Sequence, residues 1–576
     1  MPALKNRSAS RIAQTVAMPV FQAGARVAKV GYAILSSMFF ILALFQAFAA
    51  AQVADFVLVN ANIYTMNPQQ PNAKALAVKD GRILSIGETV QKHVGPKTTV
   101  LDAHGAAMIP GLIDSHGHML TLGSQMETFD FRATKTVAEV ANAIHEKSKT
   151  VKPGDWILGR SWDQTNWGGQ FPTQFLLTKA APDHPVFLTR VDGHAAWVNR
   201  KALELAKITS KTPDPPGGKI LHDQSGEPTG ILIDRAQGLV GKVIPEPSFE
   251  TVKRRLLLAS QECARLGLTT VHDAGISAET IKAYKELIAE NKLPLRVYGM
   301  IGGDGTLWQS YLKSGPEVGD FLTIRSIKLM ADGAMGSGGA AFWQPYSDDK
   351  ENTGLLLIKQ SDIERVAAEA VKAGFQVNTH AIGDRANRLV LDAYGKVLGG
   401  VNDKRFRIEH AQALALPDFE LFKKFSVIAS MQSTHATSDM RWAEKRLGPD
   451  RIAGAYAAQR FLKLGVPVAN GSDFPVEEPN PILGLYAAIT RQDLTGYPAK
   501  GWLPDQKLTR EQALKSWTVA GAYAAFEEKQ KGSLEVGKMA DFLLLSGDLM
   551  TIPEREIGKL RVTMTVVGGK VKQPNR

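Results

Sequence analysis

Several short apolar runs along the chain end in polar residues of the kinds that bind metal ions. The first run follows a Pro-Gly pair and ends in His116 and His118, with one glycine between them. Because residues two apart in a β-strand point to the same side, both imidazole rings can face one metal ion. Similar apolar runs later in the chain end in His380, His410 and Asp473.

The spacing of these runs predicts an α/β barrel. His380 and His410 lie 30 residues apart, about one strand, helix and loop in an eight-unit barrel of roughly 250 residues. Asp473 follows His410 by 63 residues, about two such units. The carboxyl ends of parallel barrel strands meet on one face, where enzymes of this fold hold their active sites. We therefore expect these side chains to meet there.

Lys328 lies inside another apolar run, between Ile327 and Leu329. A protonated lysine has no lone pair, so it cannot bind a cation. Burial lowers the pKa of a lysine and favours the neutral amine, which can add carbon dioxide and form a carbamate. The two carbamate oxygens could then bridge two cations. The alternative is a surface lysine whose stem packs on apolar neighbours.

The order of these residues, a His-x-His pair, a buried lysine, two further histidines and a late aspartate, resembles the amidohydrolase superfamily. Longer segments resemble its YtcJ-like branch, amidohydrolase family 3, which includes N-substituted formamide deformylases. These segments are residues 110–118, 191–199, 328–339, 378–384 and 470–476. The resemblance covers roughly residues 54–571 and implies a metal-dependent (β/α)8 TIM-like barrel.

The resemblance also implies a metal centre with one or two divalent ions, zinc being the first candidate. It assigns His116, His118 and Asp473 to one ion, His380 and His410 to the other, and Lys328, as N6-carboxylysine, to a bridge between them. Asp473 is in addition expected to act as the general base and then as the general acid.

Such a centre predicts hydrolysis of a non-peptide carbon–nitrogen bond, of amide or formamide type, in a small molecule by metal-activated hydroxide. Two alternatives remain open: a metal-dependent esterase or lactonase on the same site, and a secreted, non-catalytic binding protein with the amidohydrolase fold. The sequence contains no Gly-x-Ser-x-Gly elbow and no Walker or dinucleotide fingerprint, which counts against serine hydrolases and phosphate binding.

Substrate contacts are expected from a smaller group of residues outside the ligand set. Glu409 is not among them, because it precedes His410 and should face the opposite side of its strand. There we expect it to pack against its neighbours or to form a salt bridge. The candidates are Asp192 and His194 in an Asp-Gly-His segment, Arg160, Trp162 and His435.

The chain divides into three structural parts beyond its N-terminus. Alternating runs and tight-turn signals at both ends predict one composite β-sandwich from residues 52–108 and 530–576. Residues 109–529 should form the barrel. The stretch from His118 to Lys328 exceeds three barrel units by roughly 110 residues, so we expect residues 154–248 to form an inserted lid or substrate subdomain over the barrel mouth.

Residues 1–51 have the pattern of a secretory signal peptide, with a basic stretch, an apolar stretch and small residues at the end. The alternative is an uncleaved membrane anchor over residues 30–51. The segment holds five of the 68 basic residues and no acidic one, so its removal lowers the formal net charge from +11 to +6. We expect an exported, periplasmic or secreted protein without nucleic-acid partners, and the resemblance makes a homodimer plausible.

Overall fold

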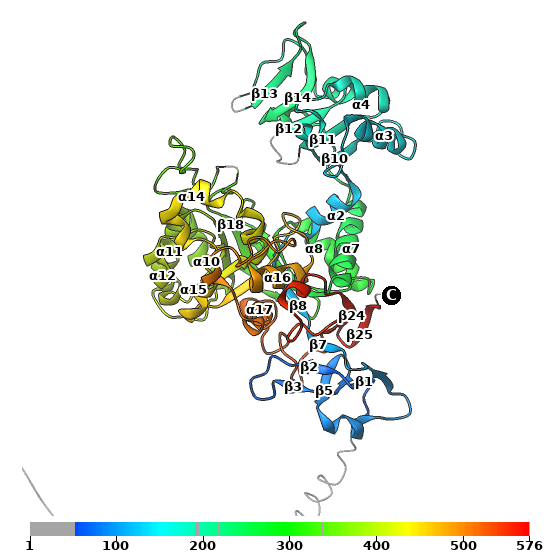
Figure 1. Cartoon of the computed structure of the whole chain (residues 1–576), viewed down its shortest axis with the longest axis vertical. Coiled ribbons are helices and arrows are strands. Elements are labelled where there is room, and N and C mark those ends of the chain that lie inside the picture. Colours follow the sequence, from blue (N-terminus) through cyan, green and yellow to red (C-terminus); the bar gives the residue numbers. More distant parts are fainter. Residues whose placement is uncertain (1–51, 191–194, 216–217, 337, 575–576) are drawn as a thin grey trace, which may run out of the picture.

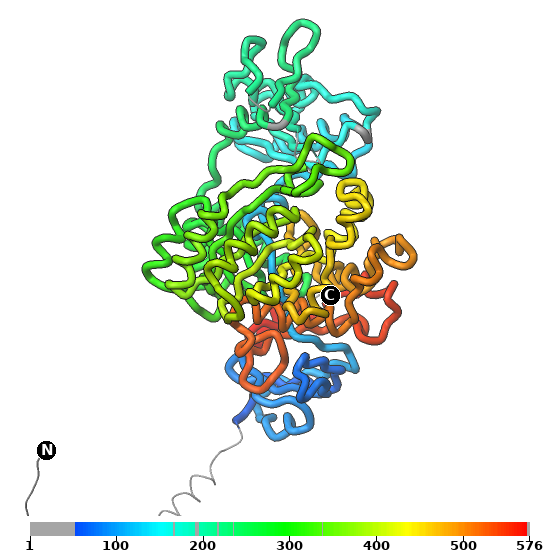
Figure 2. The backbone as a smooth tube through the Cα atoms, turned by 90° about the vertical axis from the view of Figure 1, so that its left-hand side faces the viewer, coloured from blue at the N-terminus to red at the C-terminus, as the bar shows by residue number. Residues whose placement is uncertain are grey.

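The computed structural model describes residues 52–190, 195–215, 218–336 and 338–574. The predicted signal peptide or anchor lies outside these residues. Within the described ranges, no helix is both long and apolar enough to cross a membrane. Figures 1 and 2 show a β-sandwich at one end of the molecule, a barrel in the middle and an inserted domain at the other end.

The central part is a barrel of eight parallel strands, which confirms the predicted fold class. Asp473, just after the last strand, donates its backbone N–H to the carbonyl of His116 in the first strand at 2.7 Å, so the two ends of the sheet meet. In hydrogen-bonded order the strands are β8 (Leu112–Gly117), β15 (Leu268–Ile276), β16 (Arg296–Gly302), β18 (Leu322–Met330), β19 (Gln376–Ala381), β20 (Arg407–His410), β21 (Ile428–Gln432) and β22 (Val468–Gly471).

Helices surround this sheet with their apolar faces inward. In α11, Val390, Leu391 and Tyr394 are buried, while Arg388 and Asp392 form an exposed ion pair at 2.9 Å on the opposite face. The helices are α2 (Met119–Glu127), α7 (Phe249–Arg265), α8 (Ala278–Ala289), α9 (Leu307–Ser314), α10 (Gln360–Ala373), α11 (Asp384–Leu398), α12 (Phe419–Lys424), α13 (Ser433–Asp439), α14 (Ala443–Arg451), α15 (Ala458–Lys463), α16 (Pro481–Thr490), α17 (Arg510–Ser516), α18 (Val519–Ala524) and α19 (Glu554–Ile557).

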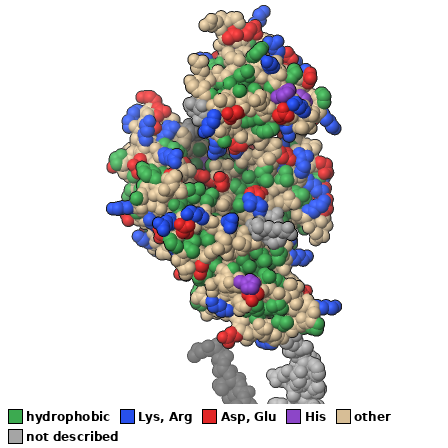
Figure 3. Space-filling view, turned by 45° about the vertical axis from the view of Figure 1, so that its right-hand side comes forward, with side chains coloured by type: hydrophobic (Ala, Val, Ile, Leu, Met, Phe, Trp, Pro, Cys, Tyr) green, Lys and Arg blue, Asp and Glu red, His purple; other side chains and the backbone are tan. Residues whose placement is uncertain are grey.

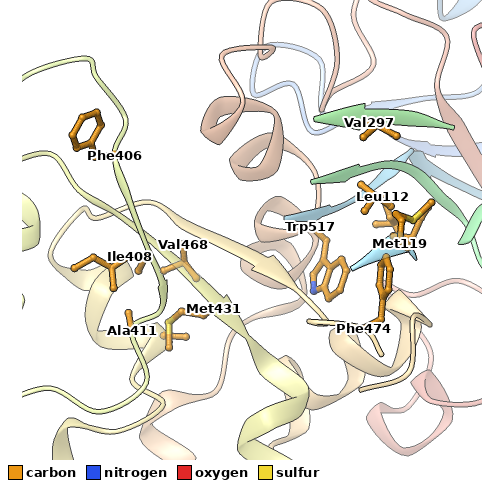
Figure 4. Close-up of a cluster of buried hydrophobic side chains, with 14 of the residues drawn as sticks. Leu112, Met119, Val297, Phe406, Ile408, Ala411, Met431, Val468, Phe474 and Trp517 are labelled. Carbon is orange, nitrogen blue, oxygen red and sulfur yellow. The ribbon is translucent and has the colours of Figure 1, made fainter. Parts of the chain in front are cut away.

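The apolar core of the barrel extends to the predicted metal ligands. Figure 4 shows Phe474, which follows β22, beside Met119 and Leu112 of the first barrel unit. A Cβ atom on Gly117 would lie 2.4 Å from the Phe474 ring. The glycine between His116 and His118 is therefore required by packing, since any side chain there would displace Phe474 and the two histidines with it.

The β-sandwich is composed of both chain ends. One sheet has the order β5-β4-β1-β6 and the other β25-β24-β23-β7-β2-β3, with Phe56 and Phe542 stacked between them at 6.4 Å. Strand β7 continues through Gly111 directly into barrel strand β8. The sandwich strands are β1 (Phe56–Val59), β2 (Asn62–Tyr64), β3 (Asn72–Ala73), β4 (Leu76–Lys79), β5 (Arg82–Ile86), β6 (Thr99–Asp102), β7 (Ala107–Pro110), β23 (Phe542–Leu545), β24 (Val562–Val567) and β25 (Lys570–Pro574).

The inserted domain is a mixed sheet with helices, placed at the end of the barrel where β8 ends (Figures 1 and 2). Its sheet begins at Phe129, ahead of the predicted Gly154, because a two-residue strand carries no alternating pattern that a sequence could reveal. Its elements are β9 (Phe129–Asp130), α3 (Val137–Ser148), β10 (Ile157–Trp162), α4 (Gln174–Ala180), β11 (Val186–Arg190), β12 (Ala195–Val198), α5 (Arg200–Leu205), β13 (Gly218–His222), β14 (Pro228–Asp234) and α6 (Gln237–Gly241).

Candidate metal centre

The six residues predicted as metal ligands come from five barrel strands and meet at the carboxyl ends of those strands, which we call the barrel mouth. His116 lies in β8, Lys328 in β18, His380 in β19 and His410 in β20, while His118 directly follows β8 and Asp473 lies two residues after the end of β22. The ring centres of His116 and His410 are 5.0 Å apart, and those of His380 and His410 are 4.5 Å apart. The structure therefore brings the predicted ligands into one cluster.

Asp473 links the histidines of this cluster. Its Oδ1 lies 3.1 Å from Nε2 of His118 and 3.6 Å from Nε2 of His116, and its Oδ2 lies 3.5 Å from Nε2 of His435. Two groups of donor atoms each lie within 4.8 Å of one another: those of His116, His118 and Asp473, and those of His410, His435 and Asp473. The first group is the ligand set that the sequence predicts for one ion.

His435 was expected only to contact substrate, and the structure places it against Asp473. Burial alone would lower the pKa of His435, but hydrogen bonds with Asp473 and Glu477 raise it to about 10. A protonated imidazole has no free lone pair for a metal ion. We therefore interpret His435 as a charged partner that orients the Asp473 carboxylate, in preference to a metal ligand.

Lys328 is buried at the centre of the cluster, where its Nζ lies 3.2 Å from Nε2 of His116. This position contradicts the alternative of a surface lysine. Burial lowers the pKa of Lys328, against the opposing charges of Glu409 and Asp473. The shift favours the neutral amine, which is the form that reacts with carbon dioxide.

Glu409 belongs to the site, contrary to the expectation that it faces away. Its Oε2 lies 2.5 Å from Nδ1 of His116, and both side chains are wholly buried. Burial alone would raise the pKa of Glu409, but its interaction with His116 lowers it to about 2. The alternation rule fails here because His410 has a φ of +73°, so the chain turns at the strand end.

The Nδ1 atoms of three histidines are engaged by neighbouring acceptors. His116 contacts Glu409, His118 lies 3.0 Å from the carbonyl of Ala274, and His410 lies 2.8 Å from Oε1 of Gln432. Such contacts keep the proton on Nδ1 and leave the lone pair on Nε2 for a metal ion. The orienting partners of the ligands are therefore already in place.

Backbone strain marks the same residues. His410 and Asp473 both have positive φ angles, +73° and +58° respectively. This region of the backbone map costs a residue other than glycine on the order of 1–3 kcal/mol, and it persists where the surrounding structure enforces it. Both residues stand at strand ends and both direct polar side chains into the cluster.

The remaining sequence candidates fall into three cases. Asp192 and His194 lie outside the described residues. Arg160 pairs with Asp130 at 2.9 Å within the inserted domain. The prediction that Trp162 shapes a substrate pocket is wrong: its side chain is wholly buried in the aromatic core of that domain, where its indole N–H donates to a backbone carbonyl at 2.8 Å.

The donor set fits a divalent metal ion. Nε2 of His380 is buried, lies 3.5 Å from Oδ1 of Asp332 and makes no hydrogen bond among the described residues. Burial lowers the pKa of His380 to about 3, so its imidazole is neutral and keeps a lone pair for a metal ion. Neutral imidazoles and a carboxylate are the ligand types that zinc and similar ions take in catalytic sites.

An eight-stranded parallel barrel with a histidine and aspartate cluster at its mouth defines a metal-dependent hydrolase. Residues 99–572 match the amidohydrolase family, so the chain belongs to this family. It is accordingly a hydrolase of the amidohydrolase family. The alternative of a non-catalytic protein does not explain why all the predicted ligands are present and meet in one cluster.

Relatives of the chain cover most of its length. It is 34% identical over 545 residues to Protein LONG AFTER FAR-RED 3 of Arabidopsis thaliana, covering 91% of this chain and 92% of that protein. It is 32% identical to YtcJ of Bacillus subtilis, covering 88% and 97%. It is 28% identical to N-substituted formamide deformylase of Arthrobacter pascens, covering 90% and 98%. The YtcJ-like branch predicted from the motifs is thereby confirmed.

A solved structure agrees with this placement. An uncharacterized metal-dependent hydrolase from Pyrococcus horikoshii has a TM-score of 0.74 and 28% sequence identity, and the match covers 87% of this chain and 99% of that one. Barrel and added domains are thus shared over nearly the whole described chain.

Proposed function

We propose that the protein hydrolyses a non-peptide carbon–nitrogen bond, of amide or formamide type, in a small molecule. The observation that carries the proposal is the position of Asp473, whose two oxygens face His118 and His435 at the centre of the histidine cluster. The 28% identity to an N-substituted formamide deformylase over 90% of the chain supports the choice of bond.

The histidine cluster would hold one or two divalent ions, with zinc as the first candidate. Bound there, a divalent cation lowers the pKa of water toward neutrality and withdraws electrons from a substrate carbonyl. The residues that would hold it are His116, His118, His380, His410 and Asp473.

Asp473 handles the proton in this proposal. Burial alone would raise its pKa, but interactions with the side chains of His118 and His435 hold the pKa well below its usual value. The group is thus a carboxylate, able to accept a proton from the attacking water at one oxygen and to return it to the leaving nitrogen. His435 keeps the second oxygen in position.

Lys328 is proposed to carry a carbamate. The neutral Nζ attacks the carbon of carbon dioxide, a C–N bond forms as one C–O π bond breaks, and one Nζ proton passes to solvent, which gives N6-carboxylysine. Incubation with 13C-labelled bicarbonate tests this step: a carbamate signal is expected in the NMR spectrum of the wild type and must be absent from Lys328→Ala. A wild type without that signal would remove the bridging role.

The function is tested with zinc-loaded protein and matched substrates. We expect N-substituted formamides to be hydrolysed with higher kcat/KM than the esters of the same acyl group, and elemental analysis to give about two ions per chain. One ion per chain would keep the hydrolase without the bridge. A preference for esters would favour the esterase or lactonase alternative.

Export, a lid and dimerisation complete the proposal. Residues 1–51 would direct the chain to the periplasm or the medium, which N-terminal sequencing of the protein from cell fractions tests.

The inserted domain would cover the barrel mouth. Figure 3 shows the surface hollowed between that domain and the barrel, with basic and acidic side chains interspersed. We further propose that the protein forms a homodimer, which gel filtration coupled to light scattering tests.

A further inference from the structure

A small cavity adjoins the metal centre on the side of His410 and His435. It has a volume of about 10 Å³, room for one oxygen-sized atom. Its polar lining comes from β20, β21 and α13 and from the loops beside them. The residues that matter are His410, Gln412, Gln432, His435, Tyr456 and Arg491.

Arg491 is buried in the wall of this cavity without an acidic partner. Its side chain donates from Nε to the carbonyl of Trp502 at 3.0 Å and from Nη1 to the carbonyl of Tyr456 at 3.1 Å. Nη2 has no hydrogen-bond partner, and Arg491 forms no ion pair, among the described residues. The guanidinium also lies over the Trp502 ring, 5.4 Å from its centroid, but it has no counter-ion there within the described chain. A buried charge without a counter-ion is costly, so this guanidinium is suited to an anion that arrives from outside the chain.

The local backbone makes the choice of arginine unusual. Arg491 caps the C-terminus of α16 with a φ of +56°, a position at which glycine is preferred. Burial lowers the pKa of Arg491 to about 10, which still leaves the group charged at neutral pH. A large cation therefore occupies a position where local propensity and desolvation both disfavour it, as functional residues often do.

A second free donor lines the same cavity. Gln432, at the end of β21, accepts from Nδ1 of His410 through Oε1 at 2.8 Å, whereas its Nε2 is buried and has no partner among the described residues. Gln432 thus touches a predicted metal ligand with one end of its amide and offers a donor with the other. Two unpartnered donors, one of them charged, call for a negatively charged oxygen.

We propose that Arg491 and Gln432 form a carboxylate-binding subsite beside the metal centre, which selects substrates that carry a carboxylate close to the scissile amide. One carboxylate oxygen enters the cavity and accepts from Nη2 of Arg491 and Nε2 of Gln432. As a statement about substrate class, the proposal rests on the amide hydrolysis proposed above, whereas the anion site itself does not.

Binding without turnover is the first test. The metal-free full chain is titrated calorimetrically with acetate and with the neutral isostere acetamide. We expect acetate to bind at least tenfold more tightly than acetamide, and Arg491→Gln to remove that preference. Arg491→Lys keeps the charge and should retain part of it. The matched control Arg460→Gln, a half-buried arginine on α15, should behave as the wild type.

Turnover by the zinc-loaded chain is the second test, with N-formylglycine and N-methylformamide as probes. Arg491→Gln should lower kcat/KM at least tenfold for N-formylglycine and less than twofold for N-methylformamide. Equal binding of acetate and acetamide to the wild type would overturn the proposal, and the cavity would then hold only water. Acetate binding that depends on Arg491, without hydrolysis of any formamide, would keep the anion site and refute the proposed function.

Discussion

Two buried arginines show how differently the two ends of the barrel are built. Arg296, where the barrel meets the β-sandwich, and Arg491, at the barrel mouth, are each 3% exposed. Arg296 donates from Nε and Nη2 to the two oxygens of Asp541 at 2.8 and 3.0 Å. Arg491 has two backbone acceptors and no carboxylate among the described residues.

The same contrast extends to the neighbours of each arginine. Asp541 also accepts the backbone N–H of Gly568 at 2.7 Å, which ties the last hairpin of the sandwich to the barrel. Around the mouth, by contrast, Nε2 of His380 makes no hydrogen bond within the described chain, although Oδ1 of Asp332 lies 3.5 Å away, and His410 and Asp473 keep positive φ angles. The junction satisfies its buried charges, whereas the mouth leaves donors and strain in place for ligands, as expected of the two faces of such a barrel.

The largest effect is expected from the variant that removes the proton acceptor at the mouth. Asp473→Asn should lower kcat by at least about 10³-fold, because an amide cannot accept the proton of the attacking water. Steady-state kinetics with a formamide substrate measures the loss, and circular dichroism should show an unchanged fold. Near-full activity would mean that another residue moves the proton.

The second effect concerns stability at the junction. Asp541→Asn leaves the Arg296 charge buried without a counter-charge and should cost about 3–5 kcal/mol of unfolding free energy. Urea unfolding measures it, while the activity of the folded fraction should not change. Asp392→Asn, which breaks an exposed pair with Arg388, is the control and should cost less than about 0.5 kcal/mol. Equal losses of unfolding free energy in the two variants would show that the buried Arg296–Asp541 pair stabilises the fold no more than an exposed pair does.

The third effect is on metal affinity. Glu409→Gln removes the carboxylate that holds Nδ1 of His116 and should weaken metal binding by about 10–100-fold. Competition with a chromogenic chelator measures the affinity. Glu364→Gln, on the outer helix α10, should leave it unchanged. If the affinity of Glu409→Gln is that of the wild type, His116 is oriented by its packing alone.

The barrel was predicted from the regular spacing of apolar runs, and this spacing is visible in the sequence itself. The spacing of His380 and His410 matches β19 and β20, and His116 and His118 meet Asp473 as predicted. Packing confirms why the glycine between them is needed, since Phe474 fills the space. Residues that alternate in regular strands and recur at one interval can be placed from sequence because geometry fixes them.

Other residues could not be placed in this way. Glu409 follows no alternation because the next residue adopts a left-handed conformation, and the sequence does not show that. The sequence around Trp162 does not distinguish a side chain that lines a pocket from one that packs in an apolar core. Arg491 follows an apolar helix as any capping residue does, and only the structure shows that its charge is buried and unpaired.

The smallest effect returns to the two arginines. Arg491→Gln should change the unfolding free energy by no more than about 1 kcal/mol, because relief of a buried charge without a counter-ion offsets two losses: the hydrogen bonds to the carbonyls of Trp502 and Tyr456, and the interaction with the C-terminus of α16. Arg296→Gln, measured beside it by urea unfolding, should lose about 3 kcal/mol or more, since it leaves the Asp541 carboxylate without its partner. A loss of that size in Arg491→Gln would mean that this arginine stabilises the fold. The arginines at the junction and at the mouth would then differ in their contacts, while both served stability.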